Sequence, residues 1–552
     1  MYVVQLPLLL TKAQSDIFEK RFGIIAHIHN QVVSFAKKQL RKLRRDKQYY
    51  EILGLILTSN KKIRNKAAAY TEEQLNHLPP KERKKYEREV AALEKEHRRF
   101  SNEMDQLISS YKLDRSGVCD YVKKQQKMFA NHISSQQAQV EAENVLDGIN
   151  SVLYGKGKDI HYKKRADFRT ISGKEPTNGV RFYCKEHPSY WKKKEPIPHK
   201  ACIDWNGLIV PVHIDRSNTY LCKAIKQGKI RYCEILRLPF HDGFHYYVVL
   251  VMEGDAPIKE RVNKKTGEVT PITHGDGRMG LDPGTSTVAG VTDKALILRE
   301  LAAGAAEYER EIKKLQASID RSKRISNPEN YKEDGTIKKG KHTWNLSKNC
   351  RKKIQKVRVL YAKRTAFIKN AHHRLANEMI QQCESIITED MDYAALQRRS
   401  KKPAERQEKE TTITKKNGEQ TTVKKFKRKK RFGHSMDNHS PGAFMVILAM
   451  TCAKYGVELI KLNPKTLKAS QYNHVTGECE PAPLSMREKE IGGKKVQRDA
   501  YSGFILENVS DDLQSVNREK CKEKFENFVS TMNAEIKRMK ESGISMKSCF
   551  GF

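Results

Sequence analysis

Three carboxylic acids stand in local patterns that suit chemistry on a phosphodiester. They are Asp282 in RMGLDPGTSTVAGVTD, Glu389 in SIITEDM and Asp499 in VQRDAYSGF. They lie far apart in the chain, so only a folded domain can bring them together. Converging carboxylates hold hard divalent cations about 4 Å apart, and such a pair clamps the attacking and leaving oxygens of a phosphodiester. The three acids therefore predict a two-metal nuclease site.

The first acid is expected on a strand that leads into a tight turn. Alternation along the strand predicts Met279 and Leu281 on one face and Gly280 and Asp282 on the other. Gly284 is expected to free the backbone to turn, so that the run STVAGV pairs back on the first strand. A single DxG sequence also marks ordinary turns, and that interpretation stays open for Asp282 taken alone.

The other two acids are expected at the end of a strand and the start of a helix. Glu389 follows a short apolar β run, and ligand sites in α/β sheets gather at the carboxyl ends of strands. Asp390 and Asp392 compete with it as neighbouring groups or caps. Asp499 precedes an amphipathic helix, where an acid is most often a cap stabilised by the helix dipole. The order and spacing of all three acids favour the catalytic interpretation.

The charge of the chain predicts a polyanionic partner. The 552 residues include 105 Lys and Arg against 66 Asp and Glu, a formal net charge of +39. Such an excess indicates nucleic acid, bound mainly through phosphates. A ribosomal or chromatin-coating protein is the alternative, but such a protein has little need for a long, patterned domain with placed acids.

Cysteine usage and hydropathy predict a cytoplasmic protein. The eleven cysteines are scattered and form no CxxC pair, which argues against a disulfide framework and indicates a reducing compartment. We see no signal peptide, and the apolar run FMVILAMTCA is about half the length that spans a bilayer. We therefore expect no membrane partner.

The chain is expected to be an α/β multidomain protein. Residues 1–12 read as a strand, 13–150 as a helical lobe and 151–270 as β runs of a small barrel that the first strand completes. Asp242-Gly243 is a hairpin signal within these β runs. Residues 271–510 alternate strands and helices, and 511–552 read as a helical tail, packed or frayed.

Three segments of the 271–510 region have their own character. Residues 300–380 are basic and helical, 397–431 form a Lys-rich insertion with an Asn417-Gly418 turn, and 468–495 form a loop before the third acid. The insertion either contacts nucleic acid, gates the site or is a solvated loop.

Basic and aromatic residues are candidates for nucleic-acid contacts. The segment KDIHYKKRADFRT interleaves both types, as a backbone-contacting surface does. Trp191 and Trp205 fit either base stacking or the barrel core, and the core is favoured. His27 and His29 are expected to pack or to contact RNA rather than to bind metal. The candidates for backbone contacts are Tyr162, Lys163, Lys164, Arg165, Arg169, Arg321 and Arg324.

The three acidic motifs resemble those of the TnpB nucleases of insertion sequences and their relatives, the compact type V CRISPR effectors. GLDPGTSTVAGV, IITEDM and VQRDAYSGFI are similar to the first, second and third RuvC motifs, and the resemblance covers nearly the whole length. RSKRISNPENYKEDGTIKKGK is similar to a basic segment that follows the first motif in many TnpB-like proteins.

The resemblance implies an RNA-guided DNA endonuclease. Its fold would be a wedge β-barrel with an inserted helical recognition lobe, followed by an RNase H-like RuvC domain. Asp282, Glu389 and Asp499 would be the catalytic, metal-binding triad, with Mg²⁺ or Mn²⁺ as the cation. The partners would be a guide RNA and double-stranded target DNA with a short flanking motif. The protein would act in a prokaryotic cytosol or nucleoid as a monomer or homodimer.

The sequence departs from this family at the zinc ribbon. Most TnpB proteins carry four cysteines between the second and third motifs, whereas KASQYNHVTGECEP has one cysteine and one histidine. A structural zinc site needs four well-placed ligands. His434, His439, His474 and Cys479 make such a set only on paper, so we expect no zinc. Ser470, Gln471 and Arg487 are candidates to hold this loop and to contact nucleic acid.

Two other functions stay open. One is an RNA-guided DNA-binding protein that acts by occupancy without cleavage, against which the intact acids argue. The other is an unguided structure-specific nuclease such as a junction resolvase. Resolvases are far smaller, and the residues before Asp282 would then have no task.

Overall fold

A computed structural model of the chain describes most residues from 1 to 551. The described ranges are 1–68, 70, 78–155, 157–185, 200–240, 242–262, 266–333, 335–397, 407–414, 420–427, 433–481, 486–544 and 550–551. The chain divides into two compact units. Unit 1 is Met1–Leu238 with Phe244–Pro257, and unit 2 is Pro239–Gly243 with Ile258–Phe552. Both units combine helices with sheets, so the expectation of a multidomain α/β protein is confirmed at this level.

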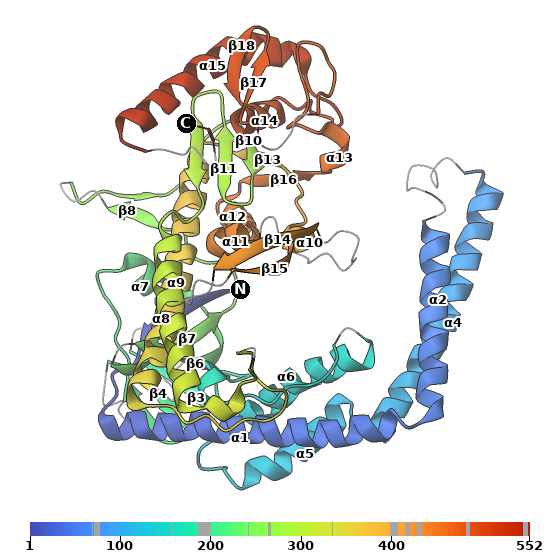
Figure 1. Cartoon of the computed structure of the whole chain (residues 1–552), viewed down its shortest axis with the longest axis vertical. Helices are drawn as coiled ribbons and strands as arrows, with labels where there is room; N and C mark the ends of the chain where they lie inside the picture. The colour runs from blue at the N-terminus through green and yellow to red at the C-terminus, as the bar shows by residue number, and fades with distance from the viewer. Residues whose placement is uncertain are drawn as a thin grey trace. The chain divides into compact units, whose positions relative to one another are not determined.

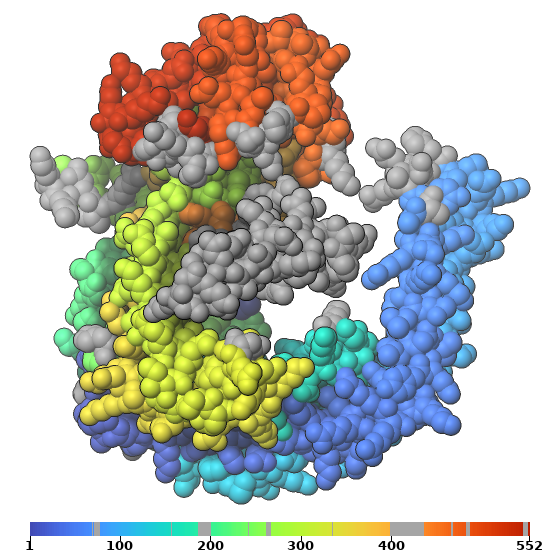
Figure 2. All heavy atoms as spheres, viewed as in Figure 1, coloured from blue at the N-terminus to red at the C-terminus, as the bar shows by residue number. Residues whose placement is uncertain are grey.

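Unit 1 contains a series of long helices. The first begins at Thr11, whose hydroxyl accepts from the Gln14 N–H while the Gln14 side chain accepts from the Thr11 N–H. Helices α2 and α4 lie side by side and project from the rest of the unit (Figures 1 and 2). The helices are α1 (Lys12–Leu43), α2 (Lys47–Ala67), α4 (Pro80–Ser110), α5 (Arg115–Lys127), α6 (Ser135–Leu153) and the shorter α7 (Thr219–Gln227).

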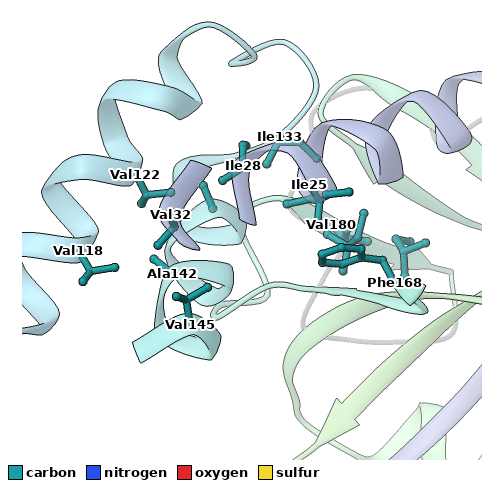
Figure 3. Close-up of a cluster of buried hydrophobic side chains, with 14 of the residues drawn as sticks. Ile25, Ile28, Val32, Val118, Val122, Ile133, Ala142, Val145, Phe168 and Val180 are labelled. Carbon is teal, nitrogen blue, oxygen red and sulfur yellow. The ribbon is translucent and has the colours of Figure 1, made fainter. Parts of the chain in front are cut away.

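The core of unit 1 is organised around α1. Ile25, Ile28 and Val32 recur at helical spacing and point into one buried cluster (Figure 3). Side chains of α5, α6 and the following β segment complete this cluster, including Val122 and Phe168. His29 is also buried on α1, with Nδ1 2.5 Å from a Glu141 carboxylate oxygen, which fits the expected packing role.

The expected β-barrel of unit 1 is wrong for the described residues. One sheet has the order β1-β7-β6-β2 and another β3-β4-β5, and a single bridge between Leu8 and Val212 links β1 to the end of β5. A barrel needs a continuous ladder, but β2 has only three residues and α7 interrupts the chain between β5 and β6. The strands are β1 (Tyr2–Pro7), β2 (Thr170–Ser172), β3 (Val180–Cys184), β4 (Ala201–Trp205), β5 (Leu208–Pro211), β6 (Ile230–Phe240) and β7 (Gly243–Met252).

Two local expectations for unit 1 are confirmed. Strands β6 and β7 are neighbours, and Gly243 has φ 142°, a value that only glycine adopts readily. Trp205 is fully buried, with its ring centroid 4.8 Å from that of Phe18, so it is a core residue. Trp191 lies outside the described residues.

Unit 2 is built on a mixed five-stranded sheet with the order β12-β11-β10-β13-β16. β12, β11 and β10 are joined antiparallel, whereas β10, β13 and β16 run parallel. The strands are β10 (Arg278–Pro283), β11 (Thr287–Val291), β12 (Leu296–Glu300), β13 (Ser385–Glu389) and β16 (Glu458–Leu462).

Helices cover both faces of this sheet. Met279 and Leu281 pack with α9 (Lys348–Ile380) and α12 (Pro441–Tyr455) on one face. On the other face lie α14 (Arg498–Glu507) and α15 (Arg518–Glu541). Helix α15 buries Phe525 and Phe528 in that core, so the C-terminal helix is packed rather than frayed. The basic helix α8 (Ala305–Ser326) packs along α9 (Figure 1).

Several short elements complete unit 2. The hairpin β17–β18 falls in a segment expected to be a loop, and its turn glycines Gly492 and Gly493 both have positive φ. In the insertion 397–431 a second hairpin forms, whose Asn417-Gly418 turn lies outside the described residues. The short elements are β8 (Glu260–Val262), β9 (Val269–Pro271), α10 (Tyr393–Gln397), β14 (Gln407–Thr414), β15 (Gln420–Lys427), α11 (Gly433–His439), α13 (Pro464–Leu467), β17 (Glu488–Ile491) and β18 (Lys494–Gln497). Across the described ranges, no helix combines the length and the apolar character that crossing a bilayer requires.

Candidate carboxylate site

The sheet register brings Asp282 and Glu389 to equivalent positions on adjacent strands. β10 and β13 run parallel, with Gly280 opposite Ile387 and Leu281 opposite Thr388. Asp282 and Glu389 are the next residues of the two strands. Neighbouring strands lie about 4.8 Å apart, and residues at equivalent positions point to the same face. The two carboxylates therefore share one face at the carboxyl ends of β10 and β13.

Helix α14 packs on this face at unusually short range because two glycines meet. A Cβ on Gly280 would fall 1.9 Å from the Gly503 carbonyl oxygen, so any side chain there would force the helix away. A Cβ on Gly503 would in turn lie 3.2 Å from the Gly280 carbonyl oxygen. The glycine pair is thus a requirement of the packing between β10 and α14.

This glycine contact sets the position of the third acid. Past the C-terminal end of α14, the Val509 carbonyl accepts a 2.7 Å hydrogen bond from Arg278 at the start of β10, so α14 runs antiparallel to β10. Asp282 lies two residues after Gly280 along β10, a distance of about 6.6 Å. Asp499 lies four residues before Gly503 along α14, a distance of about 6 Å. Both displacements point the same way and are nearly equal. Asp499 therefore comes to lie by Asp282.

Burial and like charge raise the pKa of Asp282 to about 8. Desolvation is the largest cause, followed by the charges of Asp499 and Glu389. A hydrogen bond from Ser502 and the charge of Arg498 act in the opposite direction. The three acids therefore interact electrostatically across one site.

The other two carboxylates are held by neighbouring donors. Arg498 donates from Nε and Nη2 to Asp499 Oδ1, at 3.0 and 2.8 Å. The Ala469 N–H donates to Glu389 Oε1 at 3.1 Å, and Lys468 before it has φ 47°. Burial raises the pKa of Glu389, and this hydrogen bond partly offsets the shift.

The donor set fits a hard divalent cation, although the side chains do not form a closed cage as they stand. Within the described residues, no group of three or more His, Cys, Asp and Glu side chains is placed to hold a metal ion. Arg498 forms an ion pair with Asp499 Oδ1, which is consistent with the absence of such a group among the described residues. Carboxylate oxygens are nevertheless the ligands that Mg²⁺ prefers. The pKa of Asp282 is raised first by burial and then by the charges of Asp499 and Glu389, and a bound cation would oppose both effects.

An apolar hollow of about 370 Å³ opens beside Glu389. Its lining includes Met445, Val446 and Met450 of α12, with Lys461 on β16. Tyr393 also lines it and donates to the Pro283 carbonyl at 3.1 Å, next to Asp282. Burial, followed by the charge of Asp282, raises the pKa of Tyr393.

The side chains of Tyr162, Lys163, Lys164, Arg165 and Arg169 are all exposed. Arg165 forms an ion pair with Glu19, the Tyr162 hydroxyl lies 3.3 Å from that of Ser34, and Lys163 Nζ lies 4.0 Å from Glu141 Oε1. Exposed lysines and arginines can reach phosphates, and Lys164 and Arg169 fit the expected contacts better than Arg165, which is tied to Glu19.

On α8, Arg321 and Arg324 are both exposed. Arg324 donates to the Gly335 carbonyl at 2.9 Å and packs over the Tyr331 ring at 5.1 Å, so it holds the loop that follows α8.

The loop after β16 is held chiefly by residues other than those expected. Ser470 and Gln471 make backbone contacts within it, to Lys489 at 2.5 Å and Lys468 at 2.7 Å, while the Arg487 carbonyl accepts from the Arg498 N–H at 2.9 Å. His474 is a further anchor of this loop, through its contacts with Tyr501 and Phe525.

His474 is a buried core residue. Its Nδ1 lies 2.8 Å from the Tyr501 hydroxyl, and its ring packs against Phe525 at 4.7 Å. Burial lowers the pKa of His474 to about 4, with the charges of Arg518 and Lys522 contributing. Of the other residues that could make a zinc set on paper, Cys479 is exposed and His439 Nδ1 lies 2.5 Å from the Leu301 carbonyl. The side chain of His434 lies outside the described residues.

Sequence reasoning missed four contributors to the carboxylate site. Arg498 and Ser502 flank Asp499 in RDAYS and could have been noticed as neighbours on one helix. The Ala469 N–H and the pairing of Gly280 with Gly503 depend on contacts between distant segments. No local sequence pattern predicts these two contacts.

A comparison of the chain with protein-family models and with curated proteins found no match in either.

Proposed function

We propose that the protein is an RNA-guided DNA endonuclease that hydrolyses phosphodiester bonds at one site made by Asp282, Glu389 and Asp499. The observation that carries the proposal is the convergence of these acids on one face of the unit 2 sheet, by strand register and by the Gly280–Gly503 contact. The finer fold assignment, a RuvC domain in unit 2 and a wedge with a recognition lobe in unit 1, belongs to the same proposal.

The acids have distinct roles in this scheme. Asp282 and Glu389 would hold divalent cations, Mg²⁺ or Mn²⁺, from the sheet, and Asp499 would hold them from the helix. When bound, such cations polarise the phosphate and stabilise the attacking and leaving oxygens. Arg498 would release Asp499 for this purpose, and Ser502 would keep Asp282 oriented. The apolar hollow beside Glu389 would exclude water from one side of the scissile strand.

Guided recognition accounts for the basic surface. In such enzymes base pairing with the guide reads the sequence, while protein cations hold the duplex by its backbone. Lys163, Lys164 and Arg169 of unit 1 and Arg321 of unit 2 are exposed and suit this task. Zinc has no role in the proposal.

One observation favours a second candidate, an RNA-guided DNA-binding protein that does not cut. The ion pair between Arg498 and Asp499 occupies one of the three acids. If Arg498 holds Asp499 permanently, the site would lack a ligand. An unguided nuclease would use the same three acids, and the sequencing of the co-purified RNA described below separates it from the guided enzyme.

The test begins with the chain expressed together with its native flanking DNA. The RNA that co-purifies is sequenced, and a plasmid carrying the complement of its variable end is offered with Mg²⁺. We expect one discrete RNA and cleavage of that plasmid. Asp282→Ala should reduce the rate of cleavage at least a hundredfold and leave guide and target binding intact, because it removes a cation ligand and little else.

The matched control is Asp390→Ala, which removes an exposed acid next to Glu389 and should cut normally. Mg²⁺-dependent cutting by the Asp282 variant would refute the site. Guide-dependent target binding by the wild type without any cutting would establish the second candidate. A mixture of unrelated cellular RNA would refute guided recognition.

A further inference from the structure

A polar cavity of about 120 Å³ lies within unit 1, apart from the carboxylate site. It opens between α1, α6 and the segment 163–172. Ile25 of α1 and Phe168 form its apolar side and belong to one buried cluster (Figure 3). The cavity therefore pairs an apolar side with polar groups from α6.

One of these polar groups is a buried amide that lacks a partner. Gln137 is only 1% exposed, and its Nε2 makes no hydrogen bond within the protein. Its Oε1 accepts from Trp205 Nε1 at 3.3 Å and from the Ser134 N–H at 3.1 Å, which fixes the orientation of the amide. A buried N–H donor without an acceptor is unfavourable, so a ligand that supplies an acceptor would be stabilised here.

Glu141, one helical turn further on, supplies a fixed acceptor. Its Oε1 lies 2.5 Å from His29 Nδ1, and its Oε2 accepts from Asn144 Nδ2 at 3.2 Å. Each carboxylate oxygen can accept a second hydrogen bond. The cavity thus presents an N–H donor and a carboxylate acceptor on one helix.

The rim of the cavity carries two exposed cations, Lys163 and Arg169, and one exposed acid, Asp167. Lys163 lines it and is exposed, with Nζ 4.0 Å from Glu141 Oε1. The backbone of Lys163 is fixed to α1, because its N–H donates to Asn30 Oδ1 at 3.0 Å and its carbonyl accepts from Asn30 Nδ2 at 2.9 Å. Arg169 is a second exposed cation at the rim.

We propose that this cavity binds a single unstacked guanine base of the bound nucleic acid, an inference that rests on the nucleic-acid binding proposed above. Among the bases, guanine presents two adjacent donors, N1–H and the N2 amino group, which suit Glu141, beside the O6 acceptor, which suits Gln137 Nε2. Phe168 and Ile25 would contact the base, as apolar side chains do for splayed-out bases. Arg169 would hold its phosphate, and Lys163, with Nζ 4.0 Å from Glu141 Oε1, would hold that carboxylate in the position that reads the base.

The test measures base preference in binding, independently of cleavage. The full chain, stripped of co-purified RNA at high salt, is titrated into fluorescent eight-nucleotide RNAs of uridine that carry uridine, guanosine or inosine at one central position. We expect the guanosine RNA to bind at least tenfold more tightly than the uridine RNA. Inosine lacks the N2 amino group and should fall between them. The same series in DNA shows whether the base is taken from RNA, DNA or both.

Two adjacent lysines give a matched control. Lys163 lines the cavity and Lys164 does not, yet Lys163→Ala and Lys164→Ala remove the same charge at neighbouring positions. We expect Lys164→Ala to weaken all oligonucleotides equally and Lys163→Ala to reduce the preference for guanosine as well. Glu141→Gln keeps the shape of the side chain and should lower the preference below threefold, with its fold verified by thermal melting.

The outcomes separate this inference from the proposed function. Equal binding of the guanosine and uridine RNAs by the wild type would refute the base site and leave the nuclease proposal standing. Equal effects of the two lysine variants on guanosine preference would refute the site as well. Failure of every oligonucleotide to bind would refute nucleic-acid binding itself.

Discussion

At the scale of single residues, Asp282 is the acid whose ionisation the folded structure opposes most clearly. The carboxyl is partly buried beside two other acids, and its pKa is raised to about 8. A bound divalent cation would favour the ionised form of this carboxyl, because the positive charge outweighs the repulsion from the other acids. The same residue should therefore link stability to pH and to divalent ions.

We predict that the protein without divalent cations becomes less stable as the pH rises. The folded pKa of Asp282 lies above its unfolded value of 3.8, so the folded state binds more protons than the unfolded state between these values. The contribution is fully present below about pH 4 and is lost as the pH rises through about 8. Thermal melting in EDTA at pH 5.5, 7.0 and 8.5 measures it.

Asp282→Asn should flatten this pH dependence, whereas Asp390→Asn, an exposed neighbour of Glu389, should leave it unchanged. Mg²⁺ should raise the melting temperature more at pH 8.5 than at pH 5.5. A wild-type melting temperature that rises steadily with pH in EDTA would contradict the assignment.

At the scale of elements, the site depends on how closely α14 approaches β10. Gly280 and Gly503 have no side chains, and the backbone of the helix lies against the backbone of the strand. The contact positions Asp499 beside Asp282, so the packing of one helix determines the geometry of the chemistry.

Gly280→Ala should destabilise unit 2 by about 2 to 3 kcal/mol, because the new methyl group would overlap the Gly503 carbonyl and force α14 away. The cleavage rate should fall by more than the loss of folded protein accounts for, since Asp499 would move with the helix. Gly442→Ala is the control: its Cβ would lie 3.7 Å from Tyr393, an ordinary contact, so both stability and cleavage should stay near wild type. Denaturant unfolding and plasmid cleavage measure the two effects, and normal cutting by the Gly280 variant would contradict this geometry.

At the scale of the whole molecule, the net charge of +39 is the property on which the proposed binding of nucleic acid rests. Much of this charge is exposed on segments that carry no enzymatic group, such as the lysines that follow α8. Phosphate contacts release counterions, so affinity falls steeply as salt rises.

Binding of the full chain to a duplex of random sequence should weaken by about 10³ to 10⁵ between 50 and 200 mM KCl, as expected for 6 to 10 phosphate contacts. Lys164→Ala should lower the slope of log Kd against log salt by about one unit. Arg324→Ala should leave the slope near the wild-type value, because Arg324 binds the Gly335 carbonyl and the Tyr331 ring within the protein. A salt-independent Kd would show that the charge serves another purpose.

The sequence by itself determined the elements and their faces. Alternation in RMGLD correctly placed Met279 and Leu281 opposite Gly280 and Asp282, because the side-chain period of a strand is two. The pattern from Thr11 onward predicted long helices, and IITED predicted a strand that ends at Glu389. Such local rules act over a few residues and can be read from them. The Gly492-Gly493 turn of β17–β18 is a local signal of the same kind, in a segment expected to be a loop.

Only the tertiary structure decided how these elements meet. The chain turns at Gly284 and β11 pairs back on β10, as expected, but Gly284 is not among the glycines with positive φ; instead a Cβ there would lie 3.1 Å from Thr287 Oγ1. Unit 1 contains two separate sheets in place of the expected barrel. Closing a barrel would need a longer β2 and a shorter connection than the one that contains α7. The register of β10 with β13, the Gly280–Gly503 contact and the burial of His474 join residues that are distant in the chain. Packing against distant partners fixes these features, and no local pattern contains that information.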